Sequence, residues 1–324
     1  DFIVAAGDPA HYADIAANGY QSIGDNALFI VFYPLFPFLM KIFHLFLRNY
    51  LLAGIVVSNL CMMIGNYYLY LLLKMEFNER KAWEGLMLLN MFPVSFFLIG
   101  AYTESLFIML TVMCLYYLRK ENWIAVGIIG MFASLSRTQG IVLLVPAVYE
   151  LFIAYKDKQK RTWKMAFTAL IPAGMFIYFI INQVVHGSWN AYLKYQAAEP
   201  WYNTTRWIAD NLTQHYEMAV NYSYLGILIY WAQILLFFAA MCLLGYGLYK
   251  KTRTSYIAFG GAYLFVSFLH GWLISGPRYV FGCITLYIIL ASLDNQFLKR
   301  FLIITFSIFN IIYTVWYLQG QAVM

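Results

Sequence analysis

The chain has 324 residues, of which 63% are hydrophobic and 20% are aromatic. Charged residues make up 11%, against about 25% in soluble globular proteins, and this excludes an ordinary soluble domain. The formal net charge is +6, but the basic residues lie in short clusters between apolar runs. That pattern indicates membrane topology rather than nucleic-acid binding. We therefore expect an all-α polytopic protein in contact with membrane lipids, forming one integral membrane domain over residues 1–324.

The first 27 residues are the most polar part of the chain and contain the run GDPAHYADIAANGY, which starts at Gly7. Asp8 and His11 are three residues apart and would share one face of a short helix, which we place over His11 to Ala17. Asp8 could act as a general base toward a hydroxyl. It could equally cap the helix, because Pro9 follows it. His11 could orient this carboxylate, bind substrate or be an ordinary interfacial residue.

Residues 28–48 are apolar but are interrupted by Pro34 and Pro37. Proline removes a backbone donor and bends a helix, so we expect a juxtamembrane or re-entrant segment that completes a catalytic region over residues 1–50. Later apolar runs recur to the end of the chain, and a helix of about 20 residues crosses the hydrocarbon core. We predict about ten or eleven membrane helices, with apolar runs over residues 51–73, 82–100, 104–118, 122–136, 139–155, 163–185, 222–249, 254–274, 278–294 and 301–318.

The basic residues fall on every second connection between these runs. The clusters are Lys74 with Arg80 and Lys81, Arg119 with Lys120, residues 156–164, residues 250–253, and Lys299 with Arg300. The positive-inside rule places these connections in the cytoplasm. The opposite side then holds residues 1–27, 102–104, 137–140, 186–221 and 275–278.

Three isolated charges lie on this non-cytoplasmic side. Glu104 directly precedes an apolar run, where it could cap a helix or face a cavity as a functional acid. Arg137 needs a partner, and a lipid phosphate or Glu104 would serve. Arg278 has the same character. Two such arginines suggest anion binding, because the guanidinium group matches phosphate geometry; the alternative is two structural ion pairs.

The loop over residues 186–221 is rich in Trp and Tyr, which favour the membrane interface. We interpret it as a loop that binds an acceptor molecule. The candidates for this contact, each of which could also be an ordinary interfacial residue, are Gln196, Glu199, Trp201, Asp210 and His215. The loop contains N-x-S/T triplets at Asn203, Asn211 and Asn221. The four cysteines all lie inside apolar runs and have no metal-ligand spacing. We therefore expect no metal.

Four motifs occur in a fixed order: DPAHYADIAANGY from Asp8, FYPLFP from Phe32, NMFPVSFFLIGAYTESLF from Asn90, and LSRTQG from Leu135. This ordered set resembles the PIG-V-like mannosyltransferases, relatives of GPI mannosyltransferase 2, including their bacterial homologues. The resemblance is strong over about residues 8–146. It is weaker through GSWNAYLKYQ and SGPRY.

The resemblance implies a GT-C glycosyltransferase fold and an inverting transfer of a mannose-like sugar from a polyprenyl-phosphate carrier to a glycan or glycolipid hydroxyl. The carrier lipid is a donor substrate, so no cofactor is expected. The active site would face outward from a bacterial cell membrane, or the lumen of the endoplasmic reticulum in a eukaryote. The family has a membrane helix before its first loop, and we expect one to precede Asp1.

The family's first non-cytoplasmic loop carries a Trp-Asp pair, and its Asp, the expected catalytic base, matches Asp8. Gly7 stands where the family has Trp. Glu104, Arg137 and Gln196 match positions that look functional in the family. The complete set of expected substrate-binding residues is His11, Tyr12, Glu104, Arg137, Gln196, Trp201, Arg278 and Tyr279.

A transporter or flippase of lipid-linked sugars is the competing interpretation, because broken helices and intramembrane charges suit it as well. A transporter of that kind is typically built from repeated halves, and no internal repeat is visible. A non-catalytic membrane subunit is a third possibility.

Overall fold

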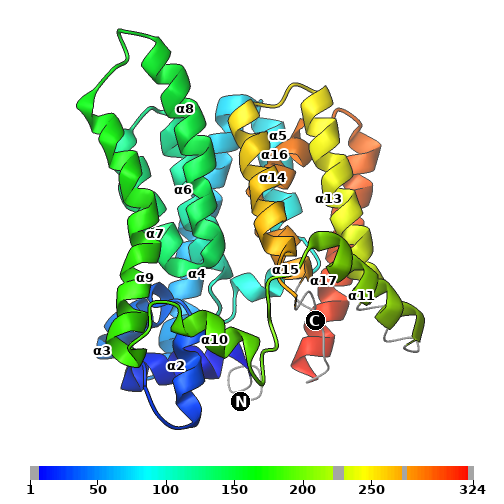
Figure 1. Cartoon of the computed structure of the whole chain (residues 1–324). Helices are drawn as coiled ribbons and strands as arrows, with labels where there is room; N and C mark the ends of the chain where they lie inside the picture. The colour runs from blue at the N-terminus through cyan, green and yellow to red at the C-terminus, as the bar shows by residue number, and fades with distance from the viewer. Residues whose placement is uncertain (1–6, 222–229, 272–275, 320–324) are drawn as a thin grey trace. The chain divides into compact units, whose positions relative to one another are not determined.

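The protein is described by a computed structural model that covers residues 7–221, 230–271 and 276–319 (Figure 1). The regular elements in this part of the chain are helices, beside one isolated antiparallel bridge between Thr205 and His270. Five of the described helical stretches are long and apolar enough to cross a membrane: residues 50–76, 138–156, 163–186, 232–249 and 296–318. The expectation of an all-α polytopic membrane protein is confirmed.

Within the described residues, fewer helices are long enough to cross a membrane than expected, because several apolar runs are broken or short. The predicted helix over 82–100 is wrong, since α5 (Glu79–Asn90) ends three residues before Pro93 and only a short 3-10 turn, η2 (Ser95–Leu98), follows. A proline cannot donate to the helix and disfavours helical backbone in the residue before it. Likewise, the run over 278–294 divides into α15 (Gly276–Phe281) and α16 (Ile284–Ser292).

The Pro-interrupted segment is bent, as its sequence predicts. A 3-10 helix, η1 (Asp25–Val31), leads into α3 (Leu35–Leu47), and the two axes differ by 111°. Pro34 stands immediately before α3 and Pro37 in its first turn, where a missing backbone N–H costs little. This pair is either a sixth, broken span or a re-entrant loop.

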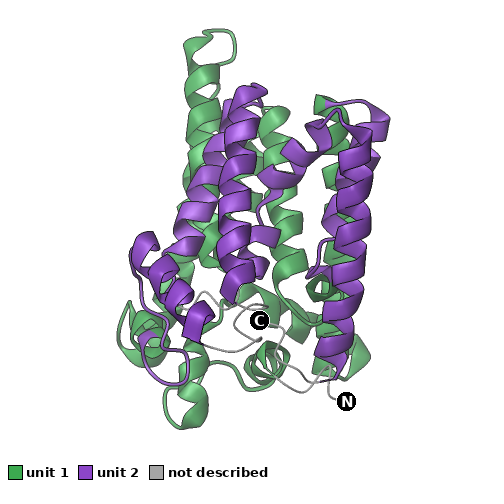
Figure 2. Cartoon of the chain, turned by 90° about the vertical axis from the view of Figure 1, so that its right-hand side faces the viewer, with its two compact units in different colours: residues 1–76, 96–196 green, residues 77–95, 197–324 purple. Residues whose placement is uncertain are grey.

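The described helices divide into two compact units (Figure 2). Unit 1 comprises residues 1–76 and 96–196, and unit 2 comprises residues 77–95 and 197–324. The expectation of a single membrane domain is not tested by this division and stays a prediction. The candidate residues Asp8, His11, Tyr12, Glu104, Arg137 and Gln196 belong to unit 1, and Trp201, Arg278 and Tyr279 belong to unit 2.

Unit 1 is a bundle of apolar helices with short helices gathered at one end. Its elements are α2 (Asp8–Asn18), η1, α3, α4 (Tyr50–Glu76), α6 (Glu104–Arg119), α7 (Trp123–Ser136), η3 (Thr138–Leu143), α8 (Leu144–Lys156), η4 (Trp163–Leu170), α9 (Ile171–His186) and α10 (Ala191–Ala197). Within this unit, α2, α3 and α10 lie together at one end, and the turn after α8 lies at the other (Figure 1). The elements that carry Asp8 and Gln196 therefore share one end.

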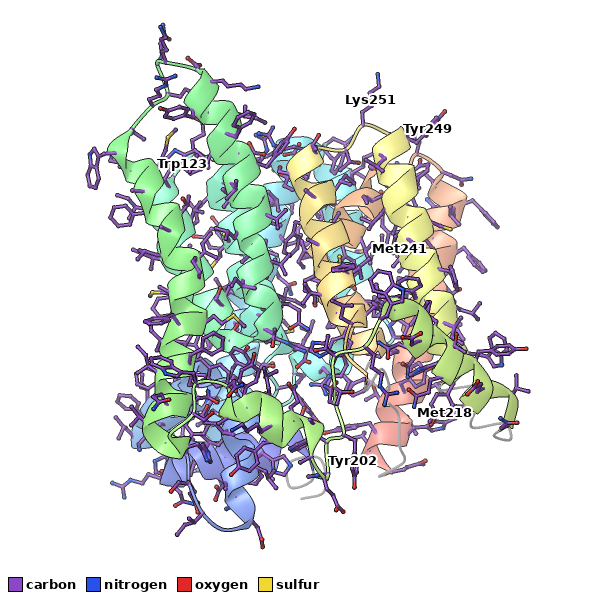
Figure 3. The ribbon with its side chains drawn as sticks, viewed as in Figure 1. Trp123, Tyr202, Met218, Met241, Tyr249 and Lys251 are labelled. Atoms are coloured by element: carbon purple, nitrogen blue, oxygen red, sulfur yellow. The ribbon has the colours of Figure 1, made fainter. Side chains whose placement is uncertain are left out.

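Unit 2 packs α5, α15 and α16 with four further helices, which are α11 (Ile208–Asn221), α13 (Ala232–Tyr249), α14 (Thr254–Phe268) and α17 (Gln296–Leu318). Tyr249 and Lys251 lie at one end of α13, and Met218 on α11 lies toward its other end (Figure 3). The part of the predicted run 222–249 that precedes residue 230 lies outside the described residues.

Basic clusters that are far apart in sequence come together within each unit. In unit 2, Asp294 accepts from Lys81 at 2.8 Å and from Lys250 at 3.3 Å, and the buried Lys299 bonds to Glu84 at 2.6 Å. In unit 1, Arg119 pairs with Glu76 at 2.5 Å, and Lys160 pairs with Glu121. These contacts fit a chain whose basic connections share one side, while the sidedness itself stays a prediction.

Close helix packing in unit 1 depends on glycine. A Cβ built on Gly174 of α9 would lie 2.0 Å from the carbonyl oxygen of Met131 in α7, far inside van der Waals contact. We predict that Gly174→Ala lowers the free energy of unfolding by about 1–3 kcal/mol, because the two backbones must separate. Thermal unfolding of the detergent-solubilised protein measures this.

The matched control is Gly261→Ala in α14, where nothing lies within 4 Å of the added Cβ. Alanine is favoured over glycine in helices by about 1 kcal/mol, so this variant should be at least as stable as the parent. Equal unfolding temperatures for Gly174→Ala and the parent would contradict the packing argument.

Candidate active site

Asp8 is the first residue of α2, and its side chain does not cap that helix. Gly7 occupies the cap position with φ of 78°, and no side-chain hydrogen bond caps the helix. Pro9 follows within the first turn, where a missing N–H costs nothing. The interpretation of Asp8 as an N-cap is therefore wrong, and so are the expected bounds of His11 to Ala17, because the Gly-Asp-Pro sequence starts the helix earlier. Asp8 is half-buried.

The second carboxylate of α2, Asp14, has a different role. One of its oxygens accepts from Asn18 Nδ2 at 2.7 Å, and the other accepts from Asn26 Nδ2 at 3.2 Å. Asn26 lies in η1, so Asp14 fastens the connection between the two helices onto α2. Asp14 therefore has a structural role in this part of the chain.

Arg137 and Glu104 form an ion pair at the same end of unit 1. Arg137 Nη1 donates to Glu104 Oε1 at 2.8 Å and to Thr103 Oγ1 at 3.3 Å. The side chain of Glu104 is 1% exposed and that of Arg137 is 16% exposed. Of the two partners expected for Arg137, the protein thus supplies Glu104. Glu104 lies in the first turn of α6, and the residue at the cap position, Thr103, makes no side-chain cap bond to that helix.

Tyr12 connects this ion pair with Asp8. Its side chain is buried, and burial raises the pKa of the hydroxyl, with the Asp8 carboxylate raising it further. Arg137 acts in the opposite direction, and Thr103 forms a hydrogen bond with the Tyr12 side chain. The hydroxyl consequently stays protonated at neutral pH and can donate. Three separate segments of sequence, around residues 8–12, 103–104 and 137, therefore meet in one polar cluster.

His11 lies on the aromatic side of α2. Its ring packs against Phe29 at 4.5 Å and Phe32 at 5.3 Å between centroids. Burial lowers the pKa of His11, against the raising effect of the carboxylates of Asp8 and Asp14. The imidazole is therefore neutral at neutral pH, able to donate and accept but not to supply a positive charge.

The LSRTQG turn fixes the position of Arg137. This residue has an extended backbone between α7 and η3, and its carbonyl accepts from Gly140 N at 2.9 Å. A Cβ on Gly140 would lie 2.1 Å from the Ala133 carbonyl oxygen. The turn therefore needs glycine because the chain folds back directly onto the last turn of α7.

A buried tyrosine cluster beside this turn was not identified from the sequence. Thr138 Oγ1 donates to the hydroxyl of Tyr33 at 3.1 Å, and the rings of Tyr33 and Tyr178 lie 4.2 Å apart. Tyr178 donates to the carbonyl of Ile30, and Tyr192 packs against Tyr178. Tyr33 belongs to the FYPLFP motif, but Tyr178 and Tyr192 lie in aromatic-rich runs where nothing distinguishes them.

The remaining predicted site residues are only partly placed. Gln196 is half-buried on α10, in unit 1. Trp201, Arg278 and Tyr279 are half-buried in unit 2, where Tyr279 stacks on His270 at 5.8 Å. We expected these residues to form one site with Asp8, Glu104 and Arg137, and this stays a prediction.

One of the three glycosylation triplets is closed to modification in the folded state. The Asn211 side chain is fully buried, and its Nδ2 donates to the carbonyls of Phe268 and His270. The expectation that the protein binds no metal stays a prediction. In the described ranges, no group of three or more His, Cys, Asp or Glu side chains is arranged to hold a metal ion.

Comparison with family models matches residues 33–185 to the family described as dolichyl-phosphate-mannose-protein mannosyltransferase. Neither the curated proteins nor the solved structures give a match. The family match covers less than half of the chain; it includes Glu104 and Arg137 but begins after Asp8. It supports a mannosyltransferase-like family of the GT-C type and does not single out the PIG-V-like group. The helical architecture is consistent with the GT-C fold.

The contribution of the buried ion pair between Glu104 and Arg137 to the free energy of unfolding can be tested by substitution. Removing one partner of a buried pair leaves an uncompensated charge and typically costs about 3–5 kcal/mol. We predict a loss of that size for Glu104→Leu, measured by denaturant unfolding in detergent.

The double variant Glu104→Leu/Arg137→Met removes both charges and should recover most of this loss, because an apolar pair of similar volume can replace a buried ion pair. If the double variant were as unstable as Glu104→Leu alone, the pair would not account for the effect.

Proposed function

We propose that the protein is an inverting glycosyltransferase that moves a mannose-like sugar from a polyprenyl-phosphate carrier to a hydroxyl of a glycan or glycolipid. The observation that carries this proposal is the cluster of Asp8, Tyr12, Glu104 and Arg137 in unit 1. In this cluster, the half-buried Asp8 carboxylate and the Arg137 guanidinium both interact with the Tyr12 side chain. The family match to residues 33–185 supports a mannosyltransferase of this general kind.

Asp8 is the proposed general base. The acceptor oxygen attacks the anomeric carbon, and its proton passes to the Asp8 carboxylate while the bond from that carbon to the phosphate oxygen breaks. The sugar leaves with inverted configuration, and polyprenyl phosphate is released. No ATP is needed, because the sugar–phosphate bond is already activated. Asp8 is proposed because it matches the Asp of the Trp-Asp pair in PIG-V-like proteins, whereas Asp14 accepts hydrogen bonds from Asn18 and Asn26.

Arg137 is proposed to stabilise the charge that develops on the leaving phosphate. Glu104 and Thr103 hold the guanidinium in a fixed orientation, and a preorganised donor is most effective in a water-poor site. Arg278 is a second candidate for this role, from unit 2. No atom of the described residues lies within 4 Å of a Cβ built on Gly7. We propose that the acceptor uses the room that Trp fills in PIG-V-like proteins.

The proposed sidedness places this cluster on the outer face of a bacterial cell membrane, or on the luminal face of the endoplasmic reticulum in a eukaryote. It rests on the basic connections, which the positive-inside rule assigns to the cytoplasm. The short helices of unit 1 gather at the end away from the turn after α8 (Figure 1).

The decisive variant is Asp8→Asn, which keeps the shape of the side chain but cannot accept the proton. We expect kcat to fall by about 10²–10⁴-fold with unchanged thermal unfolding. The assay follows a labelled polyprenyl-phosphate mannose in detergent, with an alkyl mannoside as acceptor. Asp14→Asn is the matched control on the same helix and should keep its activity.

The same assay separates transfer from transport, which the bent η1–α3 segment would also suit. Detergent abolishes compartments, so a transporter would leave the donor lipid intact. Conversion of the donor by the parent protein supports the enzyme. Parent-like turnover by Asp8→Asn would refute the role of Asp8.

A further inference from the structure

Asn182 is a fully buried amide within the apolar stretch Trp163–His186, one of the helical stretches long enough to cross a membrane. A polar group there is costly unless its hydrogen bonds are made, and such residues are commonly functional. Both ends of this amide are used. Its Nδ2 donates to the carbonyl of Tyr178 at 2.8 Å, and its Oδ1 accepts from the backbone N–H of Tyr192 at 2.8 Å.

The second of these bonds fixes the start of α10. The first amides of a helix have no partner within it, and the first three of α10 are satisfied from different sources. Ala191 N donates to Ser188 O, and Leu193 N donates to Asn190 O. Tyr192 N, between them, depends on Asn182 on a different helix. This is the bond that fastens α10 to α9.

The bond from Asn182 Nδ2 joins it to Tyr178, whose ring belongs to the tyrosine cluster beside the LSRTQG turn. The ring of Tyr178 packs 5.3 Å from that of Tyr192 and 4.2 Å from that of Tyr33. Tyr33 accepts from Thr138, the residue after Arg137. A continuous set of buried and half-buried contacts therefore joins α10 to the turn that carries the guanidinium.

Gln196 follows Tyr192 by four residues on α10, so the two side chains share one face of that helix. We propose that Asn182 is a positioning residue for the acceptor: it holds α10, and with it Gln196, against the segment that carries Thr138 and Arg137. This inference rests on the proposed function for the identity of the acceptor as a hydroxyl-bearing glycan or glycolipid. The attachment of α10 itself does not.

The first experiment needs no substrate. Backbone hydrogen–deuterium exchange is followed in the whole detergent-solubilised protein for peptides covering residues 191–197 and 8–18. In Asn182→Leu the α10 amides should exchange about five- to tenfold faster, the factor expected for losing one hydrogen bond of roughly 1 kcal/mol. Exchange in α2 should not change. In Asn182→Asp, the protonated carboxyl group keeps an oxygen that can accept from Tyr192 and a hydroxyl that can donate to the Tyr178 carbonyl, so this variant, measured at low pH, should keep the protection of α10.

The second experiment measures kinetics with polyprenyl-phosphate mannose as donor and an alkyl mannoside as acceptor. Asn182→Leu should raise the acceptor KM about five- to tenfold and leave the donor KM within about twofold, whereas a general loss of fold would lower kcat without this split. Asn310→Leu is the control for removing an amide from another membrane helix, because Asn310 bonds to Phe92 and Pro93 in unit 2. It should not raise the acceptor KM selectively.

The outcomes distinguish the two proposals. Unchanged α10 exchange in Asn182→Leu overturns the positioning role, whatever the activity. Faster α10 exchange with an unchanged acceptor KM overturns the link between α10 and the acceptor. A parent protein that does not convert the donor, or an active Asp8→Asn variant, counts against the proposed function and leaves the exchange result standing.

Discussion

The buried ion pair between Arg137 and Glu104 is the constraint on which the candidate site depends. A guanidinium among apolar helices is tolerable only if a carboxylate meets it with good geometry, and this requires the end of α7 to lie against the start of α6. Thr103 and Tyr12 extend the same network toward α2. The pair therefore organises three segments that are distant in sequence.

The two carboxylates of α2 show that residues of the same type can have different surroundings on one helix. Asp8 and Asp14 lie on one short helix, but Asp14 is held by two asparagine amides. Asp8 starts the helix without capping it. Asp14 therefore has a structural role, whereas the choice of Asp8 as the base rests on the resemblance and stays a prediction.

Glycine and proline shape this fold in different ways. Pro34, Pro37 and Pro93 end or bend helices through the backbone, which is a local effect of the residue itself. The bend before α3 was expected, whereas the early end of α5 was not, since the apolar run continues past Pro93. Gly140 and Gly174 act through close approach of another backbone. No sequence pattern predicts which other backbone segment will pack against these glycines.

The sequence by itself determined the class of the molecule, the polar loop at its start and the charges that seek partners. Those conclusions follow from hydrophobic runs, from the clustering of Lys and Arg, and from the cost of an isolated charge in lipid. Only the tertiary structure decided that Glu104 is the partner of Arg137. It alone placed Tyr12 beside them and joined Asn182 to the start of α10. The physical reason is that these contacts connect residues that are 10, 33 and 91 positions apart (Asn182 with Tyr192, Glu104 with Arg137, and Tyr12 with Thr103). An apolar helix carries no local signal of which neighbour it will meet.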